Sequence, residues 1–323
     1  MKVAVCDISF CAHPALKAEL LALHPDARFN DPDVQLQGDA LVRFVGDAEA
    51  AIIGLSRITG PVLDALPGMG IVSKYGVGMD GIDLSACEVR GVRVGWRPGV
   101  NRHAVAEFAL GQLITLLRGL HSTHAAVVGG GWSRAAPGAS RQLSEVTVGV
   151  LGCGQVGAEV MRLCRAFGAR VLACDVRDVS AICEARGAAQ VDLETLLAES
   201  DALTLHTPLT GATRGLLDGA MLDRLPAGAV VVNTARGGIV DEVALADRLR
   251  DGRLGGAAFD VYASEPPAGS PLLALPNFRA SAHLASGSEA GKLAMGRAAI
   301  AGLTEHRRAA DVRAEIERLG GYG

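Results

Sequence analysis

Several features common in other protein classes are scarce in this chain of 323 residues. Aromatic residues make up only 4%, although hydrophobic residues make up 49%, so we expect a core of alanine, valine and leucine. A net charge of −4 argues against a general nucleic-acid binder, whose binding surface is basic. No segment approaches the roughly 18 uninterrupted apolar residues of a membrane span, and the N-terminus lacks the apolar region of a signal peptide.

The cysteines show no sign of a disulfide framework. There are seven of them, an odd number, and no two form a C-x-x-C pair. We expect reduced, mostly buried thiols and no bound metal, with zinc a remote alternative. Together with the missing leader and membrane span, this predicts a soluble protein of the cytoplasm without a membrane partner. The seven are Cys6, Cys11, Cys87, Cys153, Cys164, Cys174 and Cys183.

The length favours two domains. Short apolar runs alternate with helical patterns along the whole chain, which is typical of parallel sheets covered by helices. A loop rich in small residues, at 129–144, separates two such series. We expect α/β architecture, with strands at 3–6, 51–54, 71–73 and 92–95 in the first series, and at 146–151, 170–174, 202–206, 229–233, 256–259 and 278–282 in the second.

The helical patterns complete this outline. Asn101 is the expected N-cap of a long helix from about 102 to 121. The last helix, at about 288–305, is expected to pack back on the first series, and a charged tail follows from residue 306. Further helices are expected near 14–23, 61–66 and 84–90, and from the glycine-rich turn at 152 to about 167.

The clearest local motif is GCGQVG, which directly follows the strand expected at 146–151. Gly152 permits a tight turn, Gly154 lets the backbone approach a pyrophosphate, and Gly157 allows close contact between helix and strand. The bare motif is weak evidence, but Asp175 ends the next strand at the required spacing. Asp175 predicts NAD in preference to NADP, and Arg177 argues slightly against that preference. Another nucleotide or a methyl donor on the same fold is the alternative.

Three polar residues follow neighbouring apolar runs of the second series: Arg236, Glu265 and His283. Ligands in open α/β sheets lie outside the carboxyl ends of the strands. A guanidinium matches two carboxylate oxygens, and an imidazole suits proton donation to a ketone near neutral pH. Each residue alone has an ordinary structural interpretation, but the set and the upstream glycine motif together predict a hydride-transfer site.

The segments carrying these residues, NTARGGIVDE, DVYASEP and SAHLASGSEA, resemble the Arg–Glu–His motifs of the NAD-dependent D-2-hydroxyacid dehydrogenase family. KYGVGMDGID, PGVNRHAVAE and HTPLT resemble further motifs in the family's order, so the resemblance covers about 71–290. The similarity is greatest to the phosphoglycerate dehydrogenase-like branch, without its regulatory domain. Two departures are Ala282, where proline is usual, and Gly81, where asparagine is common.

The resemblance implies two Rossmann-like, doubly wound parallel-sheet domains. Residues 1–101 and 284–323 would form the substrate domain, and 102–283 an inserted NAD-binding domain. It also implies a homodimer formed through the helix after Asn101.

Roles also follow from the resemblance. Arg236 would bind the substrate carboxylate, His283 would act as the acid in reduction and the base in oxidation, and Glu265 would hold the other imidazole nitrogen. The substrate-binding residues implied are Lys74, Tyr75, Gly76, Val77, Gly78, Arg236 and His283. The NAD-binding residues implied are Gly152, Gly154, Gln155, Val156, Gly157, Asp175, His206, Thr207, Pro208, Thr234, Ala235, Arg236, Asp260 and His283. Among these, Asp260 would hold the nicotinamide carboxamide, and residues 206–208 would lie beside the adenosine half.

We therefore expect an oxidoreductase that transfers a hydride between NAD(H) and C2 of a D-2-hydroxy acid or 2-keto acid. An NAD-sensing, corepressor-like binding protein is the rival hypothesis. Lys74, Arg97, Arg102 and Arg134 together hint at a substrate with a second anionic group, as in 3-phosphoglycerate, although an ordinary solvated cation is the favoured interpretation of any one of them. Hydroxypyruvate or glyoxylate is the alternative substrate.

Overall fold

The computed structural model describes residues 1–132 and 140–320, which form two compact units. Unit 1 comprises Met1–Asn101 and Gly287–Gly323, and unit 2 comprises Arg102–Ser286. Unit 2 is therefore inserted into the sequence of unit 1, as predicted. The return to unit 1 follows Ser286, whereas the sequence placed it after His283.

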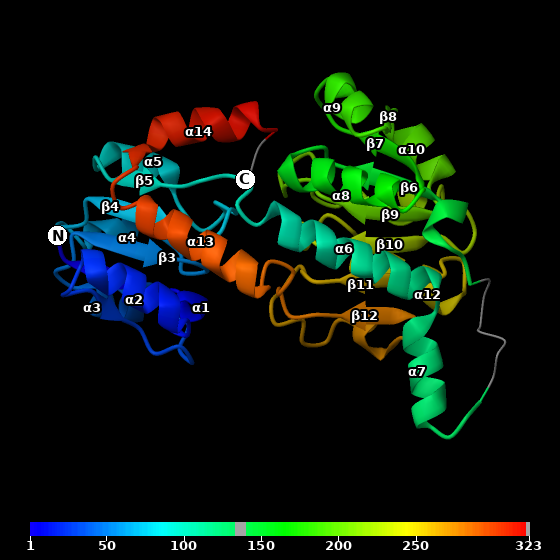
Figure 1. Cartoon of the computed structure of the whole chain (residues 1–323), viewed down its shortest axis with the longest axis horizontal. Helices are drawn as coiled ribbons and strands as arrows, with labels where there is room; N and C mark the ends of the chain where they lie inside the picture. Colours follow the sequence, from blue (N-terminus) through cyan, green and yellow to red (C-terminus); the bar gives the residue numbers. More distant parts are fainter. Residues whose placement is uncertain (133–139, 321–323) are drawn as a thin grey trace. The chain divides into compact units, whose positions relative to one another are not determined.

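Unit 1 is built on a six-stranded sheet of order β13-β5-β4-β3-β1-β2. Its strands β5, β4 and β3 are labelled in Figure 1. Every neighbouring pair is parallel except β13 with β5. The register places Val5 beside Ile52. The strands are β1 (Val3–Val5), β2 (Arg28–Phe29), β3 (Ala50–Ile53), β4 (Ile71–Lys74), β5 (Arg93–Gly95) and β13 (Arg307–Arg308).

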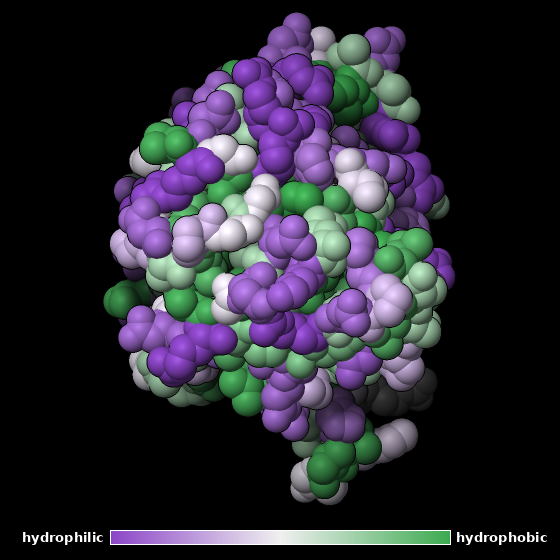
Figure 2. Space-filling model, turned by 90° about the vertical axis from the view of Figure 1, so that its left-hand side faces the viewer, coloured by the Kyte–Doolittle hydropathy of each residue, from purple (hydrophilic) through white to green (hydrophobic). Residues whose placement is uncertain are grey.

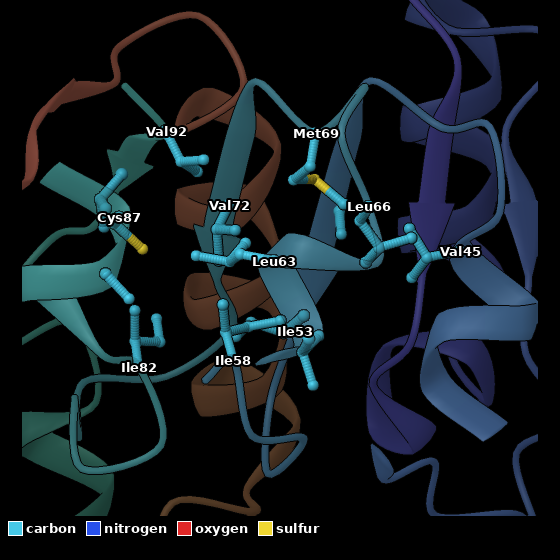
Figure 3. Packing of buried hydrophobic residues seen from close by; sticks show 14 of the residues in the cluster. Val45, Ile53, Ile58, Leu63, Leu66, Met69, Val72, Ile82, Cys87 and Val92 are labelled. Carbon is cyan, nitrogen blue, oxygen red and sulfur yellow. The ribbon is translucent and has the colours of Figure 1, made fainter. Parts of the chain in front are cut away.

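Helices cover both faces of this sheet because successive strand residues point to opposite sides. Val3 and Val5 join the core under α1, α2 and α13, whereas Ala4 joins the core under α3, α4, α5 and α14. In the second core, Leu63 of α4 lies against Val72 of β4 (Figure 3). The helices are α1 (Ile8–Cys11), α2 (Pro14–Leu23), α3 (Gly38–Val45), α4 (Gly60–Asp64), α5 (Leu84–Val89), α13 (Glu289–Ala301) and α14 (Ala309–Arg318).

The expected charged tail after residue 306 is wrong. β13 pairs with β5, and α14 then packs Ala309, Val312 and Ile316 into the core of unit 1. These three residues recur at helical spacing and form the apolar stripe that makes the segment a helix. The prediction also missed β2 and α3, between the first two expected strands.

Unit 2 holds a seven-stranded, wholly parallel sheet of order β12-β11-β10-β9-β6-β7-β8. Valine, leucine and alanine dominate its buried strands, as is usual for a sheet covered on both faces. Its strands are β6 (Thr147–Leu151), β7 (Arg170–Cys174), β8 (Ala189–Gln190), β9 (Ala202–Leu205), β10 (Val230–Asn233), β11 (Gly256–Phe259) and β12 (Phe278–Ala280).

Two separate cores lie on the two faces of this second sheet. One lies under α6, α8 and α9, and the other under α10, α11 and α12. The predicted doubly wound α/β architecture is therefore confirmed for both units. The helices are α6 (Arg102–Leu117), α7 (Leu120–Val128), α8 (Gln155–Ala166), α9 (Ser180–Ala185), α10 (Leu193–Glu199), α11 (Gly219–Leu222) and α12 (Glu242–Arg250), with 3-10 turns η1 (Leu143–Glu145) and η2 (Pro271–Ala274).

The single long helix expected after Asn101 is in fact two helices. α6 is followed by α7, and Gly119 stands between them at φ +59°. Asn101 does not cap α6 as predicted, because its Oδ1 is buried and has no hydrogen-bond partner in the described part of the chain. The buried stripe of α6 packs against α8 and β10. Of the loop expected at 129–144, residues 133–139 lie outside the described residues.

Hydrophilic and hydrophobic residues are interspersed on the face shown in Figure 2. None of the helices in residues 1–132 and 140–320 has both the length and the apolarity needed to cross a bilayer.

Candidate active site

Arg236, Glu265 and His283 follow three adjacent strands of unit 2, namely β10, β11 and β12. Parallel strands end at the same edge of a sheet, so the three side chains are carried by one edge.

A buried amide fixes the turn that carries Arg236. Asn233, fully buried at the end of β10, donates from Nδ2 to the carbonyl of Arg236 at 2.9 Å and accepts from the Ala235 N–H at 3.0 Å. Gly237 packs so tightly that a Cβ there would lie 1.8 Å from the Tyr262 carbonyl carbon. A residue with a side chain therefore cannot replace Gly237 unless the backbone shifts. Arg236 donates from Nη1 to the Ala235 carbonyl at 2.7 Å.

Glu265 and His283 form a direct pair. Oε2 of Glu265 lies 2.8 Å from Nδ1 of His283, and Oε1 accepts from the Tyr262 N–H at 3.1 Å. Because an ionised carboxylate only accepts, Nδ1 carries a proton. Nε2 has no partner within the described ranges, and the imidazole is 37% exposed. The accessible ring nitrogen is therefore the one available for proton exchange with a ligand.

The charge of Glu265 is stabilised where it lies. Burial alone raises the pKa of this carboxyl group, but the hydrogen bond and charge of His283, the Tyr262 N–H and the charge of Arg236 outweigh that effect and lower the pKa. Glu265 is therefore ionised at neutral pH. The charge of Arg236 is the smallest of these contributions to the lowered pKa, and it places Arg236 in the same electrostatic neighbourhood as the Glu265–His283 pair.

Asp260 holds the segment that carries His283. Its carboxylate is buried and accepts from Ser281 Oγ at 2.6 Å, from the Leu284 N–H at 3.0 Å and from the Ala285 N–H at 2.8 Å. The Asp260 carbonyl also accepts the His283 N–H at 2.9 Å. These bonds maintain His283 at φ +53°, a left-handed conformation that is uncommon for a residue other than glycine.

The glycine-rich turn has the geometry expected from its motif. Gly152 has φ +95°, and a Cβ there would lie 2.6 Å from the His206 carbonyl carbon and 2.7 Å from the Thr207 nitrogen. A Cβ on Gly157 would lie 2.0 Å from the Gly152 carbonyl oxygen. α8 then begins after Gly154 without a side-chain cap, which leaves its first N–H groups for an anion.

Asp175 lies beside this turn, as predicted, but it is also paired with Arg177. The carboxylate accepts the Cys153 N–H at 2.8 Å and is bound by the guanidinium through Nε and Nη2, both at 2.9 Å. Burial raises the pKa of Asp175, but Arg177 and the backbone donors outweigh burial and lower it.

The residues of unit 2 fit a dinucleotide. Besides the open helix terminus and Asp175, the side chain of Thr234 has a buried Oγ1 with no hydrogen-bond partner among the residues described. His206 is neutral, because burial lowers its pKa to about 3, and its Nε2 lies 2.9 Å from Thr204 Oγ1. The remaining residues of the predicted cofactor set belong to these same turns: Gln155, Val156, Pro208 and Ala235.

The predicted carboxylate-binding loop belongs to unit 1. Lys74 ends β4, is buried, and donates from Nζ to the Gly54 carbonyl. Tyr75 is buried too, and its hydroxyl has no hydrogen-bond partner in residues 1–132 and 140–320. Burial raises its pKa further than the nearby charges of Asp7 and Glu289 do. Gly76 follows at φ +103°, and Val77 and Gly78 complete the loop.

The other cations proposed for a second anionic group are less available than the sequence suggested. Arg97 pairs with Glu305 at 2.6 Å, and Arg102 takes part in an interaction of its own. Arg134 lies outside the described residues. All seven cysteines are free, and six are buried. No group of three or more potential ligands within the described ranges is placed to hold a metal.

Sequence reasoning missed the residues that position the site, namely Asn233 and Ser281, and gave Asp260 a different role. Asn233 and Asp260 both end apolar strands, and a polar residue in such a place must be hydrogen-bonded. That signal was present in the sequence. Their partners were not predictable, because each bond joins different turns of the sheet edge.

Comparisons with known proteins agree with this geometry. Residues 110–285 match the model of the "D-isomer specific 2-hydroxyacid dehydrogenase, NAD binding domain" family. D-3-phosphoglycerate dehydrogenase of Archaeoglobus fulgidus is 36% identical over 80% of this chain and 49% of its own length. Hydroxypyruvate reductase of Thermotoga maritima is 31% identical over 79% of this chain and 84% of its own. The structure of D-lactate dehydrogenase from Escherichia coli aligns with a TM-score of 0.78 at 27% identity, covering 99% of this chain and 98% of that one.

The chain belongs to the D-isomer specific 2-hydroxyacid dehydrogenase family, and it carries that family's NAD-binding domain. The family predicted from the sequence is confirmed, as is the predicted cofactor. The chain spans about half the length of the phosphoglycerate dehydrogenases that it matches.

Proposed function

We propose that this chain is an NAD-dependent dehydrogenase that interconverts 2-keto acids and D-2-hydroxy acids. The observation that carries the proposal is the 2.8 Å pair between Glu265 and His283, with Arg236 in the same electrostatic neighbourhood. An acid–base histidine, a carboxylate that orients it and a guanidinium for the substrate carboxylate are the groups that this reaction needs. NAD supplies the hydride acceptor, and NADH the donor.

Each residue then has a defined task. The guanidinium of Arg236 binds the substrate carboxylate and polarises the keto oxygen. His283 donates the proton on Nε2 to that oxygen during reduction and removes it during oxidation. Glu265 fixes the ring orientation and stabilises the imidazolium charge.

We propose hydroxypyruvate or glyoxylate as the keto acid. Arg97 is paired and Lys74 is buried against a carbonyl, so neither offers a ready site for a second anionic group. The hydroxypyruvate reductase of Thermotoga maritima is also similar along most of its length. Phosphohydroxypyruvate is the second candidate, favoured by the 36% identity to a phosphoglycerate dehydrogenase.

Steady-state kinetics tests both the proposed dehydrogenase activity and the proposed choice of keto acid. NADH oxidation is followed with glyoxylate, pyruvate, hydroxypyruvate, phosphohydroxypyruvate and oxaloacetate. We expect turnover, with kcat/KM highest for hydroxypyruvate or glyoxylate. If NADH binds with micromolar affinity and no acid is reduced, the enzyme assignment is wrong and an NAD-sensing role is supported. A preference for phosphohydroxypyruvate would instead overturn only the choice of substrate.

Two variants test the assigned roles. Arg236→Lys keeps the charge but loses the bidentate fork, so we expect kcat/KM to fall about 100-fold. His283→Ala removes the proton donor and is expected to lower kcat about 1000-fold. NADH affinity should change less than threefold in Arg236→Lys, which fluorescence titration measures. A similar loss of NADH affinity and kcat/KM would place Arg236 in cofactor binding instead.

We also propose a homodimer formed through the α6–α7 region. None of the residues of α7 is buried within the described part of the chain, and Leu120, Val127 and Val128 are exposed. Isolated apolar helix faces of this kind mark contact surfaces. Sedimentation should give a dimer mass for the wild type and a monomer mass for Val127→Asp. A monomeric wild-type protein would contradict the assignment.

A further inference from the structure

The carboxylate of Asp175 is fully engaged in this structure. It accepts the Cys153 N–H at 2.8 Å, the Arg177 N–H at 3.0 Å, and Nε and Nη2 of the Arg177 guanidinium, both at 2.9 Å. An ionised carboxylate offers about four lone-pair positions. All of them are therefore occupied by donors of the protein itself.

A hydroxyl group of the adenosine ribose needs one of these positions. In the dinucleotide-binding fold, the acidic residue at the end of the second strand accepts a hydrogen bond from the ribose hydroxyl. Asp175 can do this only if the Arg177 side chain releases its bidentate contact. The backbone around Arg177 need not move, because Gln190 fixes it by donating to the Arg177 carbonyl at 2.9 Å and accepting from the Val179 N–H at 2.9 Å.

The released guanidinium remains at the ribose. Arg177 is only two residues from Asp175, and its side chain is 29% exposed, so a released guanidinium can turn into the solvent beside Asp175. A guanidinium fork binds a phosphate through two parallel hydrogen bonds. It also offsets the repulsion that Asp175 exerts on a 2′-phosphate.

We propose that Arg177 is a specificity-determining residue that masks Asp175 in the free protein and allows NADPH to bind alongside NADH. For NADH, Arg177 is a competitor that must be displaced. For NADPH, it supplies the counter-charge for the 2′-phosphate. The site is thus less selective for NADH than Asp175 alone would make it. The inference rests on the cofactor side of the proposed function, and a binding experiment tests it without any turnover.

The experiment measures dissociation constants of NADH and NADPH by nicotinamide fluorescence, for wild type, Arg177→Ala and Arg177→Lys. AMP and adenosine 2′,5′-bisphosphate, measured by calorimetry, report the adenosine half alone. We expect the two dinucleotides to bind wild type within about tenfold of each other. In Arg177→Ala, NADPH should bind about 30-fold more weakly, and NADH should bind equally well or up to about fivefold more tightly.

Arg170→Ala is the matched control. Arg170 lies on β7 of the same unit and pairs with the exposed Glu199 at 2.7 Å, so its removal changes the net charge equally. It should shift both dinucleotides by less than about twofold. Arg177→Lys keeps a charge without the fork and should give an intermediate NADPH affinity. If Arg177→Ala fails to fold, this variant decides the question.

Three results would overturn the proposal. The first is that wild type binds NADPH more than about 100-fold more weakly than NADH, which would show that Arg177 does not offset Asp175. The second is that the ratio of the two dissociation constants is the same in Arg177→Ala and Arg177→Lys as in wild type. The third is that Arg170→Ala reproduces the effect, in which case net charge and not Arg177 is responsible. Absence of turnover with bound NADH would instead contradict the dehydrogenase assignment and leave this inference intact.

Discussion

In both units the first strand lies inside the sheet, and the chain turns from its carboxyl end into a helix. β1 lies between β3 and β2, and β6 lies between β9 and β7. In unit 1 the turn carries Asp7, whose carboxylate caps α1 by accepting the Phe10 N–H at 2.8 Å. In unit 2 it carries Gly152 and Gly154, and α8 begins without a side-chain cap. The position that the protein's own carboxylate fills in unit 1 is left in unit 2 for the phosphate of a cofactor.

A glycine beside each of these turns also differs in what its missing side chain makes room for: Gly54, which follows β3, lies against the first turn, and Gly152 lies in the second. A Cβ at Gly54 would lie 1.7 Å from Oδ2 of Asp7, so this glycine makes room for a buried side chain. A Cβ at Gly152 would strike the backbone of residues 206 and 207, so that glycine brings two turns together at the edge of the sheet. The same fold is therefore closed in one unit and open to a ligand in the other.

The largest effect is expected from Gly152→Val. A side chain at φ +95° that also meets the His206 backbone costs several kcal/mol, so we expect NADH to bind about 1000-fold more weakly. Fluorescence titration measures this. Unchanged binding would mean that the turn can open without loss of the cofactor site, and the contrast between the units would fail.

In unit 1 the comparison variant is Gly54→Ala, at the glycine that lies against Asp7. This change should affect the stability of the protein and not its NADH affinity. The added methyl group displaces the Asp7 carboxylate from its buried position, and we expect the free energy of unfolding to fall by about 3 kcal/mol. Denaturant unfolding measures the loss. NADH affinity of the remaining folded protein should stay within about twofold of wild type. A large loss of NADH affinity without loss of stability would contradict the division of roles.

In unit 2, the buried carboxylate of Asp260 positions the segment of His283, whereas the buried carboxylate of Asp7 in unit 1 caps a helix. Asp260→Asn keeps the shape of the side chain but weakens the bonds that hold the segment of His283, so kcat should fall about tenfold. The pH profile of kcat should also shift, whereas NADH affinity should change little. If NADH affinity falls more than kcat, Asp260 acts mainly on the nicotinamide, as the sequence resemblance implied.

The smallest expected effect is on the pH dependence of the free energy of unfolding. Asp7 and Asp175 should contribute to it with opposite signs. Burial raises the pKa of Asp7, so its contribution to stability is present at low pH and is lost as pH rises through its folded pKa. For Asp175, burial is outweighed by Arg177 and the backbone donors and the pKa is lowered, so its contribution is present above the ordinary pKa of 3.8 and is lost as pH falls.

Unfolding of Asp7→Asn and Asp175→Asn between pH 3 and pH 7 tests this difference. Relative to wild type, Asp7→Asn should gain stability as pH rises, and Asp175→Asn should lose it. Slopes of the same sign would show that the two carboxylates are in equivalent environments.

Much of the fold could be predicted because its main strands are continuous apolar runs followed by turn residues. The runs at β6 and β10 are examples, and each was found to within a residue or two. Two-residue strands such as β2 and β13 carry no such pattern. The buried face of α14 is marked only by Ala309, Val312 and Ile316, and charged residues surround these three in the sequence, so the segment resembles a solvated tail.

The candidate site also has features that the sequence could predict and features that it could not. The placement of Arg236, Glu265 and His283 at one edge of the sheet could be predicted, because each follows a strand and ligands of open α/β sheets lie at the strand ends. The pairing of Arg177 with Asp175 could not, because the direction of a surface arginine depends on the shape of its turn. The bonds from Asp260 to residues 281–285 depend on two strands lying side by side, which spacing along the chain does not reveal.

The left-handed backbone at His283 sets the stability of the protein against the ability of this residue to transfer a proton. Holding a histidine at φ +53° costs on the order of 1 kcal/mol, and asparagine adopts this region more readily. An asparagine there could still donate to Glu265, yet it could not exchange a proton with a substrate. Under the proposed acid–base role, stability alone would therefore favour asparagine at residue 283, whereas turnover requires the imidazole.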